Sequence, residues 1–206
     1  VAAGALEFMD ALRLVMQRGA LMGEVKGGAM SAVLGLTQDE LLALLSQDAH
    51  AHIDMANINT PTQLVVSGLT DAFEQFEASA KEAGAKKVVR LNVSGAFHSP
   101  LMSKAKDALH EHLSNMEIND TSFPVYTNFS SKPASFKAEI QLALLNQIEN
   151  PVLWHDIIKR MIEDGISTAV EIGPSKVLQG LSKRINRSLI MYGAESYEDI
   201  LNLNNV

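Results

Sequence analysis

The stretch NVSGAFHSPLM, Asn92 to Met102, decides how the rest of the chain is interpreted. Before it, apolar and polar residues alternate from Val89 to Ser94, which is the period of a half-buried strand. After it, Ser99 and Pro100 are typical of a helix N-cap and a first helical position. The sequence therefore predicts a strand that enters this stretch and a helix that leaves it, with His98 at the junction.

His98 is a candidate general base. It would lie just before a helix N-terminus, where the positive end of the helix dipole disfavours the imidazolium form, so the ring should stay neutral and able to accept a proton. The small residues Gly95 and Ala96 leave room beside it. From position alone, a loop histidine with an ordinary structural hydrogen bond is the commoner case, and this stretch supplies no nucleophile.

The composition is that of an ordinary globular protein. The chain has 206 residues, of which 47% are hydrophobic and 20% charged, enough to bury one substantial core or two small ones. A net charge of -7 argues against a nucleic-acid-binding role, and no apolar run reaches membrane-spanning length. The absence of cysteine excludes disulfides, thiolate metal sites and a cysteine nucleophile, and it agrees with a reducing compartment.

The middle of the chain alternates between strand and helix patterns. Strands are predicted at 29–34, 53–58, 63–67 and 86–93, with a turn at 59–62, and helices at 37–45 and 71–83. Thr37 and Glu40 form a capping box at the start of the first helix. The order βαββαβ is the ferredoxin-like pattern. We therefore expect a compact subdomain over 29–93, inserted into a core made of 1–28 and 94–206.

The flanking segments predict an α/β core. Outside the inserted unit, helix patterns (7–22, the segment after Pro100, 136–148, the segment after Pro151, and 175–186) alternate with strand patterns (123–128, 168–172 and 188–191). This alternation favours an α/β layer with a mostly parallel sheet. The helix over 7–22 would bury a stripe made of Phe8, Ala11, Leu12, Val15, Gly19 and Met22.

Other candidate sites are weaker. The pairs His50/His52 and His110/His112 have no carboxylate at ligand spacing, so we interpret them as structural or solvated and predict no metal site. A serine nucleophile needs a base and an oxyanion hole. No G-x-S-x-G elbow occurs in the chain.

Basic residues stand out in two places. Arg18 lies on the edge of the predicted apolar stripe, so its stem can pack while its guanidinium reaches a cleft, although a solvated arginine is commoner. The segment 174–188 contains Lys176, Lys183, Arg184 and Arg187 and no acidic residue. It is either a solvated amphipathic helix or a landing face for an acidic partner.

Five segments, taken together, resemble the malonyl-CoA:acyl carrier protein transacylases, the acyltransferases of bacterial fatty-acid synthesis. They are DALRLVMQRG (10–19), NINTPTQLVVSG (57–68), GAFHSPLM (95–102), NPVLW (150–154) and EIGPSKVL (171–178). The resemblance implies an α/β-hydrolase-like core with an inserted ferredoxin-like subdomain. It also implies a ping-pong reaction without a bound cofactor, in which a serine takes malonyl from malonyl-CoA and passes it to the phosphopantetheine thiol of acyl carrier protein.

The resemblance also assigns roles to residues. His98 is the general base and acid. Arg18 binds the free malonyl carboxylate through a bidentate contact that a lysine would lose. The backbone carbonyl of Leu153 orients His98, and Asn59 lies near the histidine. Phe97 crowds an α-methyl group and so favours malonyl over methylmalonyl.

The same resemblance implies a partner and a missing group. Acyl carrier proteins are acidic, so the basic residues of 174–188 are expected to steer docking. The G-H-S-x-G serine of the family would lie upstream of Val1, so we expect this chain alone to be inactive. A cytoplasmic monomer is expected. Two alternatives stay open: a polyketide-synthase acyltransferase domain, and a non-catalytic relative that binds carrier protein.

Overall fold

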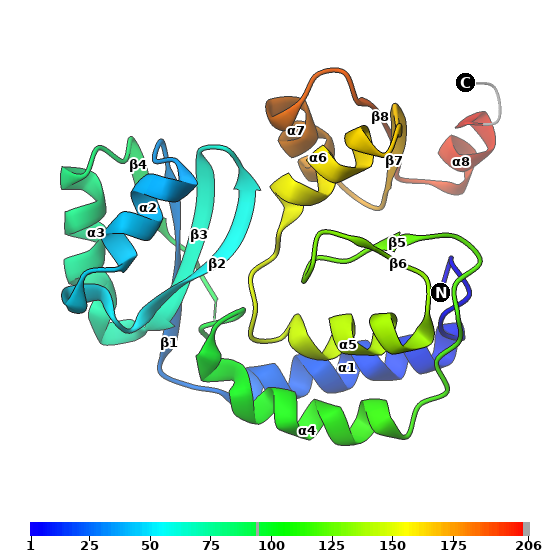
Figure 1. Ribbon diagram of the computed structural model, residues 1–206, viewed down its shortest axis with the longest axis horizontal. Coiled ribbons are helices and arrows are strands. Elements are labelled where there is room, and N and C mark those ends of the chain that lie inside the picture. The colour runs from blue at the N-terminus through cyan, green and yellow to red at the C-terminus, as the bar shows by residue number, and fades with distance from the viewer. Residues whose placement is uncertain (94, 204–206) are drawn as a thin grey trace.

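The computed structural model describes residues 1–93 and 95–203, so Ser94, the last residue of the alternating pattern noted in the sequence, lies outside the described residues. The molecule has three parts in Figure 1: a four-stranded sheet with two helices, a layer of helices, and a smaller C-terminal part. No helix in the described ranges has the length and apolar character needed to cross a membrane.

The sheet part runs from residue 28 to residue 90. Its elements are β1 (Gly28–Leu34), α2 (Gln38–Leu45), η1 (Asp48–His50), β2 (Ile53–Thr60), β3 (Gln63–Leu69), η2 (Thr70–Ala72), α3 (Phe73–Glu82) and β4 (Lys87–Arg90). The long elements follow the predicted βαββαβ order. The strands lie in the order β2-β3-β1-β4, and each neighbouring pair is antiparallel. The predicted capping box of Thr37 and Glu40 is confirmed.

Both faces of this sheet are packed. On one face α2 and α3 cover a cluster that includes Phe73 and Phe76, which are fully buried. On the other face Met30, Ala56 and Val65 are buried, and Phe97 packs against them. Side chains of β1 and β3 point alternately to the two faces of the sheet, and both faces are buried, so neither face is left to solvent.

The helical layer consists of α1 (Phe8–Glu24), η3 (Pro100–Met102), α4 (Ser103–Ser114) and α5 (Lys137–Asn146). Figure 1 shows α1, α4 and α5 running side by side. A short hairpin, β5 (Val125–Tyr126) with β6 (Pro133–Ala134), packs against the same apolar cluster. Leu109 and Leu113 of α4 are the centre of this cluster, with 1% and 0% exposure.

The C-terminal part contains α6 (Trp154–Glu163), β7 (Thr168–Ile172), α7 (Val177–Ile185), β8 (Ile190–Ala194) and α8 (Tyr197–Leu203). Strands β7 and β8 pair in parallel. Helices α6 and α7 both contact β2. Outside the sheet part, the described strands form two separate two-stranded sheets, parallel for β7–β8 and antiparallel for β5–β6, so the single mostly parallel sheet expected there is not found in the described residues.

Two local predictions are wrong for identifiable reasons. No helix starts at Asn150–Pro151, because the Val152 N–H donates to the Ala56 carbonyl (2.9 Å) and the Val152 carbonyl accepts from the Ile58 N–H (2.9 Å). These bonds hold the segment against β2, and α6 begins only at Trp154. The turn predicted at 59–62 is shorter, since β2 continues to Thr60.

Two more predictions, about a helix end and a helix face, are correct only in part. Ser99 and Pro100 occupy the predicted N-cap and first position, but of the single turn η3 that precedes α4, and the Ser99 hydroxyl donates to the Ala96 carbonyl (2.8 Å) instead of accepting a capping bond. The predicted buried stripe of α1 is correct for Met22, which is buried, and for Ala11, which packs against the core, but Phe8 is 64% and Val15 65% exposed, and Leu14 is buried instead. Helix α1 has apolar residues on more than one side, so periodicity could not choose between its faces.

Candidate active site

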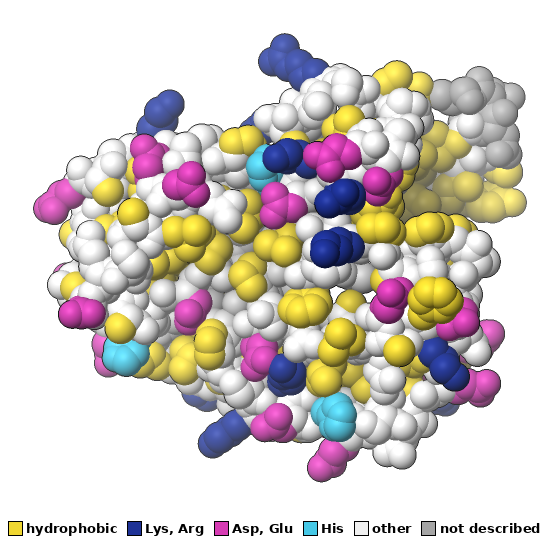
Figure 2. Space-filling model, viewed as in Figure 1, with side chains coloured by type: hydrophobic (Ala, Val, Ile, Leu, Met, Phe, Trp, Pro, Cys, Tyr) yellow, Lys and Arg dark blue, Asp and Glu magenta, His cyan; other side chains and the backbone are white. Residues whose placement is uncertain are grey.

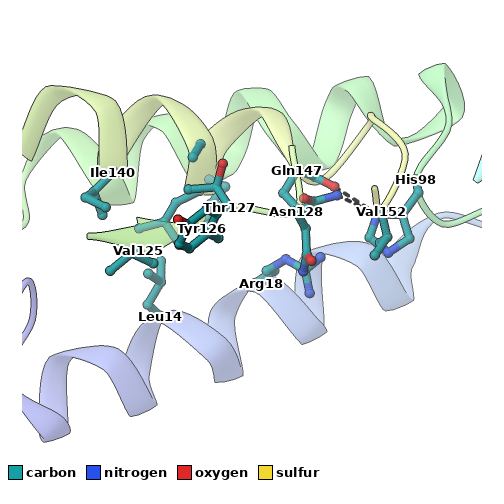
Figure 3. Close-up of a pocket in the computed structure, with 13 residues that line it drawn as sticks. Leu14, Arg18, His98, Val125, Tyr126, Thr127, Asn128, Ile140, Gln147 and Val152 are labelled. Atoms are coloured by element: carbon teal, nitrogen blue, oxygen red, sulfur yellow. Dashed lines mark hydrogen bonds between the residues drawn. The ribbon is translucent and has the colours of Figure 1, made fainter. Parts of the chain in front are cut away.

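His98 lies in the loop between β4 and η3, where its backbone is left-handed, with φ of 61°. This conformation is uncommon for a residue other than glycine. The imidazole Nδ1 lies 2.8 Å from the carbonyl oxygen of Gln147, which follows α5 (Figure 3). A carbonyl oxygen can only accept, so Nδ1 carries the hydrogen and Nε2 is left free to accept a proton.

The carbonyl at the ring was predicted to be that of Leu153, and this prediction is wrong. The Leu153 carbonyl accepts from the Ile157 N–H (3.0 Å) at the start of α6. Gln147 is the C-cap residue of α5, so its carbonyl is directed out of the helix and reaches His98.

The turn that presents the Gln147 carbonyl is itself hydrogen-bonded. The side-chain amide of Gln147 donates to the carbonyls of Asn150 (2.9 Å) and Pro151 (3.2 Å). The next residue, Val152, is bound to β2, and the Leu153 N–H donates to the Asn128 carbonyl (3.0 Å). The sheet part and the β5–β6 hairpin thus both hold the turn behind the histidine.

Burial lowers the pKa of His98 below its ordinary value; the hydrogen bond to the Gln147 carbonyl opposes this shift, and the nearby charge of Arg18 adds to it. The ring is therefore neutral at neutral pH, as the sequence predicted. The physical cause is burial first, rather than the helix dipole from which the prediction was made.

Arg18 projects from α1 toward the same site (Figure 3). Burial lowers the pKa of its guanidinium, which nonetheless stays charged at any physiological pH. The ion pairs found in the described part of the chain do not include Arg18. A half-buried cation without a carboxylate partner is suited to bind an anionic ligand.

One cavity of about 490 Å³ brings Arg18 and His98 together. Its polar lining also includes Asn128 and Gln147, and its other end is apolar, with Leu14, Leu109, Val125, Ile140, Ala143 and Leu144. Sequence reasoning missed Asn128 and Gln147. Asn128 could have been noticed as the end of a predicted strand, which is where α/β folds place ligand contacts.

Of the other predicted residues, Phe97 lies at the site and Asn59 does not line it. Phe97, Arg18 and His98 line a second hollow of about 250 Å³. Asn59 lies in β2, outside both hollows that His98 lines. Its predicted proximity to the histidine stays a prediction.

The basic residues of the C-terminal part separate into two groups. Lys176, Lys183 and Arg187 line one surface hollow of about 540 Å³, together with the apolar Leu189, Ile190 and Met191. Arg184 lies elsewhere, and its guanidinium donates to the side-chain carbonyl of Gln63 (2.8 Å) in β3. Figure 2 shows basic and acidic side chains interspersed over the C-terminal part, and apolar ones gathered between the sheet part and the helical layer.

The histidine pairs noted in the sequence differ in their surroundings. Residues 1–93 and 95–203 contain no group of three or more His, Asp or Glu side chains arranged to hold a metal ion. His50 is buried edge-on against the Phe76 ring, with centroids 5.6 Å apart. His52, His110 and His112 are exposed.

Comparison with known proteins gives one consistent result. The sequence model of the family described as acyl transferase domain matches residues 1–198. A malonyl CoA-acyl carrier protein transacylase of Bacillus subtilis is 41% identical over 194 residues, covering 92% of this chain and 61% of the relative. The transacylase of Haemophilus influenzae is 38% identical over 210 residues, covering 100% of this chain and 66% of the relative.

Solved structures agree in fold. The acyl carrier protein S-malonyltransferase of Vibrio cholerae superposes with a TM-score of 0.93 at 33% identity, covering 98% of this chain and 67% of that one. The S-malonyltransferase of Burkholderia pseudomallei gives 0.94 at 34% identity, covering 100% and 68%. A type II polyketide acyl-carrier protein in complex with its malonyl-transacylase gives 0.93 at 35% identity, covering 99% and 68%.

These matches confirm the resemblance found in the five sequence segments. The chain shares the α/β fold of these two solved transacylases over 98% and 100% of its length, and it spans 61% and 66% of the length of the two curated relatives above. Because the family match covers residues 1–198, the chain belongs to the acyl transferase domain family.

Proposed function

We propose that this chain takes part in the transfer of malonyl from malonyl-CoA to the phosphopantetheine thiol of acyl carrier protein, in fatty-acid biosynthesis. The observation that supports this proposal best is the joint position of His98 and Arg18. One offers a free, neutral imidazole nitrogen and the other a half-buried cation, and both line one cavity.

In the proposed ping-pong reaction the nucleophile is the serine of a G-H-S-x-G motif, which this chain does not contain. Nε2 of His98 takes the hydroxyl proton as the serine oxygen attacks the thioester carbonyl. The carbon–sulfur bond breaks, and the proton passes to the coenzyme A thiolate. In the second half His98 deprotonates the phosphopantetheine thiol, which attacks the acyl-serine, and the proton returns to the serine oxygen.

Arg18 is proposed to hold the free carboxylate of the malonyl group. A guanidinium offers two parallel N–H donors that match a carboxylate, and its partial burial strengthens the pairing. The same charge helps to keep His98 neutral. Arg18 would thus both select the substrate and help to keep the base, His98, unprotonated.

We also propose that the chain consists of two structural units. We assign 29–93 to a ferredoxin-like subdomain, supported by the βαββαβ order and by the strand order β2-β3-β1-β4. Residues 1–28 and 94–206 are assigned to an α/β-hydrolase-like core. The short parallel pair β7–β8 is compatible with this assignment.

Three further roles rest on the resemblance. Phe97, beside Arg18 and His98, is proposed to disfavour an α-methyl group, so Phe97→Ser should raise the kcat/KM for methylmalonyl relative to malonyl. Asn59 is proposed to approach the histidine in the active protein. Lys176, Lys183 and Arg187, with Arg184 near them in sequence, are proposed to steer an acidic carrier, in which case higher salt should slow transfer.

A polyketide carrier is a second candidate acceptor, favoured by one structural match: the malonyl-transacylase bound to a type II polyketide acyl-carrier protein. Activity with purified fatty-acid and polyketide carriers would separate the two. No bound cofactor is proposed, and a cytoplasmic monomer stays a prediction.

The decisive experiment is mass spectrometry of peptides after brief exposure to malonyl-CoA. It compares this chain with the same chain extended upstream to include a G-H-S-x-G segment. We expect malonyl on the serine of the extended protein only, and its loss when holo-carrier protein is added. A folded extended protein that takes no malonyl would overturn the proposed function.

A further inference from the structure

The two segments that form the His98 hydrogen bond are joined by a side chain outside the cavity. His98 lies just before α4, and the Gln147 carbonyl lies just after α5. From α4, the ammonium group of Lys106 donates to the side-chain oxygen of Asn146 (3.0 Å) and to the carboxylate of Glu149. Lys106 therefore contacts residues on both sides of Gln147 in the sequence.

This contact is not an ordinary surface ion pair. The side chains of Lys106 and Glu149 are only 24% and 22% exposed, whereas the pair Arg13–Asp10 on α1 is 68% and 46% exposed. A partly buried pair is screened less by salt and is held in a more defined geometry than an exposed one. The Ser103 hydroxyl adds a second, longer contact from α4 to Glu149 (3.3 Å).

The internal bonds of the turn do not replace this link. The Gln147 amide bonds to Asn150 and Pro151, and the Asn150 amide donates to the Asn146 carbonyl (2.8 Å). All of these bonds lie within one segment, so they fix the shape of the turn but not its distance from the start of α4. Lys106 connects the turn to the helix that His98 precedes.

We propose that Lys106, paired with Glu149 and Asn146, is a positioning residue for His98. It keeps the Gln147 carbonyl against Nδ1, which holds the hydrogen there and leaves Nε2 as the proton acceptor. The catalytic meaning of this link rests on the proposed function of His98, but the link can be measured without catalysis. A displacement of a base by about 1 Å is enough to lose much of its rate contribution.

The first test is nuclear magnetic resonance of the chain with isotope-labelled histidine, using His98→Asn to assign the His98 signals. In the unmodified chain we expect a single tautomer with a protected Nδ1 hydrogen. Lys106→Met should speed exchange of this hydrogen about tenfold and populate the Nε2–H tautomer, as expected when a half-buried pair is broken. The charge swap Lys106→Glu with Glu149→Lys should recover most of the protection.

Lys104→Met is the matched control, since Lys104 is an exposed lysine on the same helix. It should leave the Nδ1 hydrogen unchanged. Thermal unfolding of each variant shows whether it is folded, and the charge swap remains informative if Lys106→Met is not. Unchanged His98 protection in folded Lys106→Met, or protection lost equally in Lys104→Met, would overturn the proposal.

A second readout separates this proposal from the proposed function. In the extended protein, Lys106→Met should lower kcat with little change in KM and shift the pH profile, and the charge swap should restore both. If Lys106 alters the His98 tautomer while no malonyl adduct ever forms, the positioning role stands and the transfer function falls. If the adduct forms at a rate that Lys106→Met does not change, the transfer function stands and the positioning role falls.

Discussion

The sheet part and the helical layer bury their apolar residues very differently. In the sheet part both faces are covered, and Val33, Leu41, Phe73 and Phe76 have 0% exposure. In the helical layer α1 is covered on one side only, and Met16 on its outer face is 67% exposed. Both faces of the sheet are thus enclosed, whereas Arg18 projects from a helix that is covered on one side.

His98 lies where these two regions meet. Its neighbour Phe97 packs against the cluster on the second face of the sheet and also against the cluster of the helical layer. Sites that must admit a ligand are commonly drawn from the less stable parts of a fold and are fixed by a rigid neighbour. The sheet part therefore provides the rigidity at the site, and the helical layer provides the access to it.

The largest expected effect breaks the sheet core. Phe76→Ala removes a fully buried ring from between α2, α3 and the sheet, so it should cost about 3–5 kcal/mol of unfolding free energy. Val15→Ala on the outer face of α1 should cost no more than about 0.5 kcal/mol. Urea unfolding measures both, and similar losses would show that the two regions are not packed differently.

The next effect concerns the cation of the helical layer. Arg18→Met should weaken malonate binding by about tenfold to a hundredfold, because a charge-assisted hydrogen-bonded pair contributes about 1.5–3 kcal/mol. The malonate affinity of Arg18→Lys should lie between those of Arg18→Met and the unmodified chain, since lysine keeps the charge without the paired donors. Calorimetric titration with malonate measures the affinity, with Arg13→Met as the control on the exposed side of α1. Equal malonate affinities for all variants would show that Arg18 does not bind the carboxylate.

A smaller effect comes from the acid titration of His98. Its pKa is lowered by burial in the folded chain, so the folded state binds this proton less readily than the unfolded state. The stability it contributes is complete above the unfolded pKa of about 6.5 and is lost as the pH falls below that value. Unfolding free energy measured across this range should decline less in His98→Asn than in the unmodified chain. Parallel pH curves would contradict the buried neutral ring.

The smallest effect is expected where the C-terminal part touches the sheet. The bond from Arg184 to Gln63 is exposed, so Arg184→Met should cost about 0–1 kcal/mol. Carrier docking should depend less on Arg184 than on Lys183, because Lys183 lines the basic hollow and Arg184 does not. Surface plasmon resonance with immobilised carrier protein would measure the difference, and a larger loss for Arg184→Met would reverse this ranking.

Local patterns predicted the sheet part well, because its strands are short apolar runs separated by turn residues and helix patterns, and Thr37–Glu40 marks a helix start. They failed where long-range contacts decided. The segment after Asn150 contains good helix-start residues, yet Val152 forms backbone hydrogen bonds with the edge of β2 instead of a helical turn. The resemblance found His98 and Arg18 but named the wrong carbonyl, because the choice between Leu153 and Gln147 depends on how the turn folds back.

The left-handed backbone of His98 affects how its role should be examined genetically. Alanine, the usual inactivating replacement, is penalised in this region by contact of its Cβ with the following carbonyl. A loss of activity in an alanine variant would therefore have two causes that cannot be separated, the missing imidazole and a change in the shape of the loop. Asparagine enters this region more readily, so it separates the chemistry of the side chain from the shape of the loop.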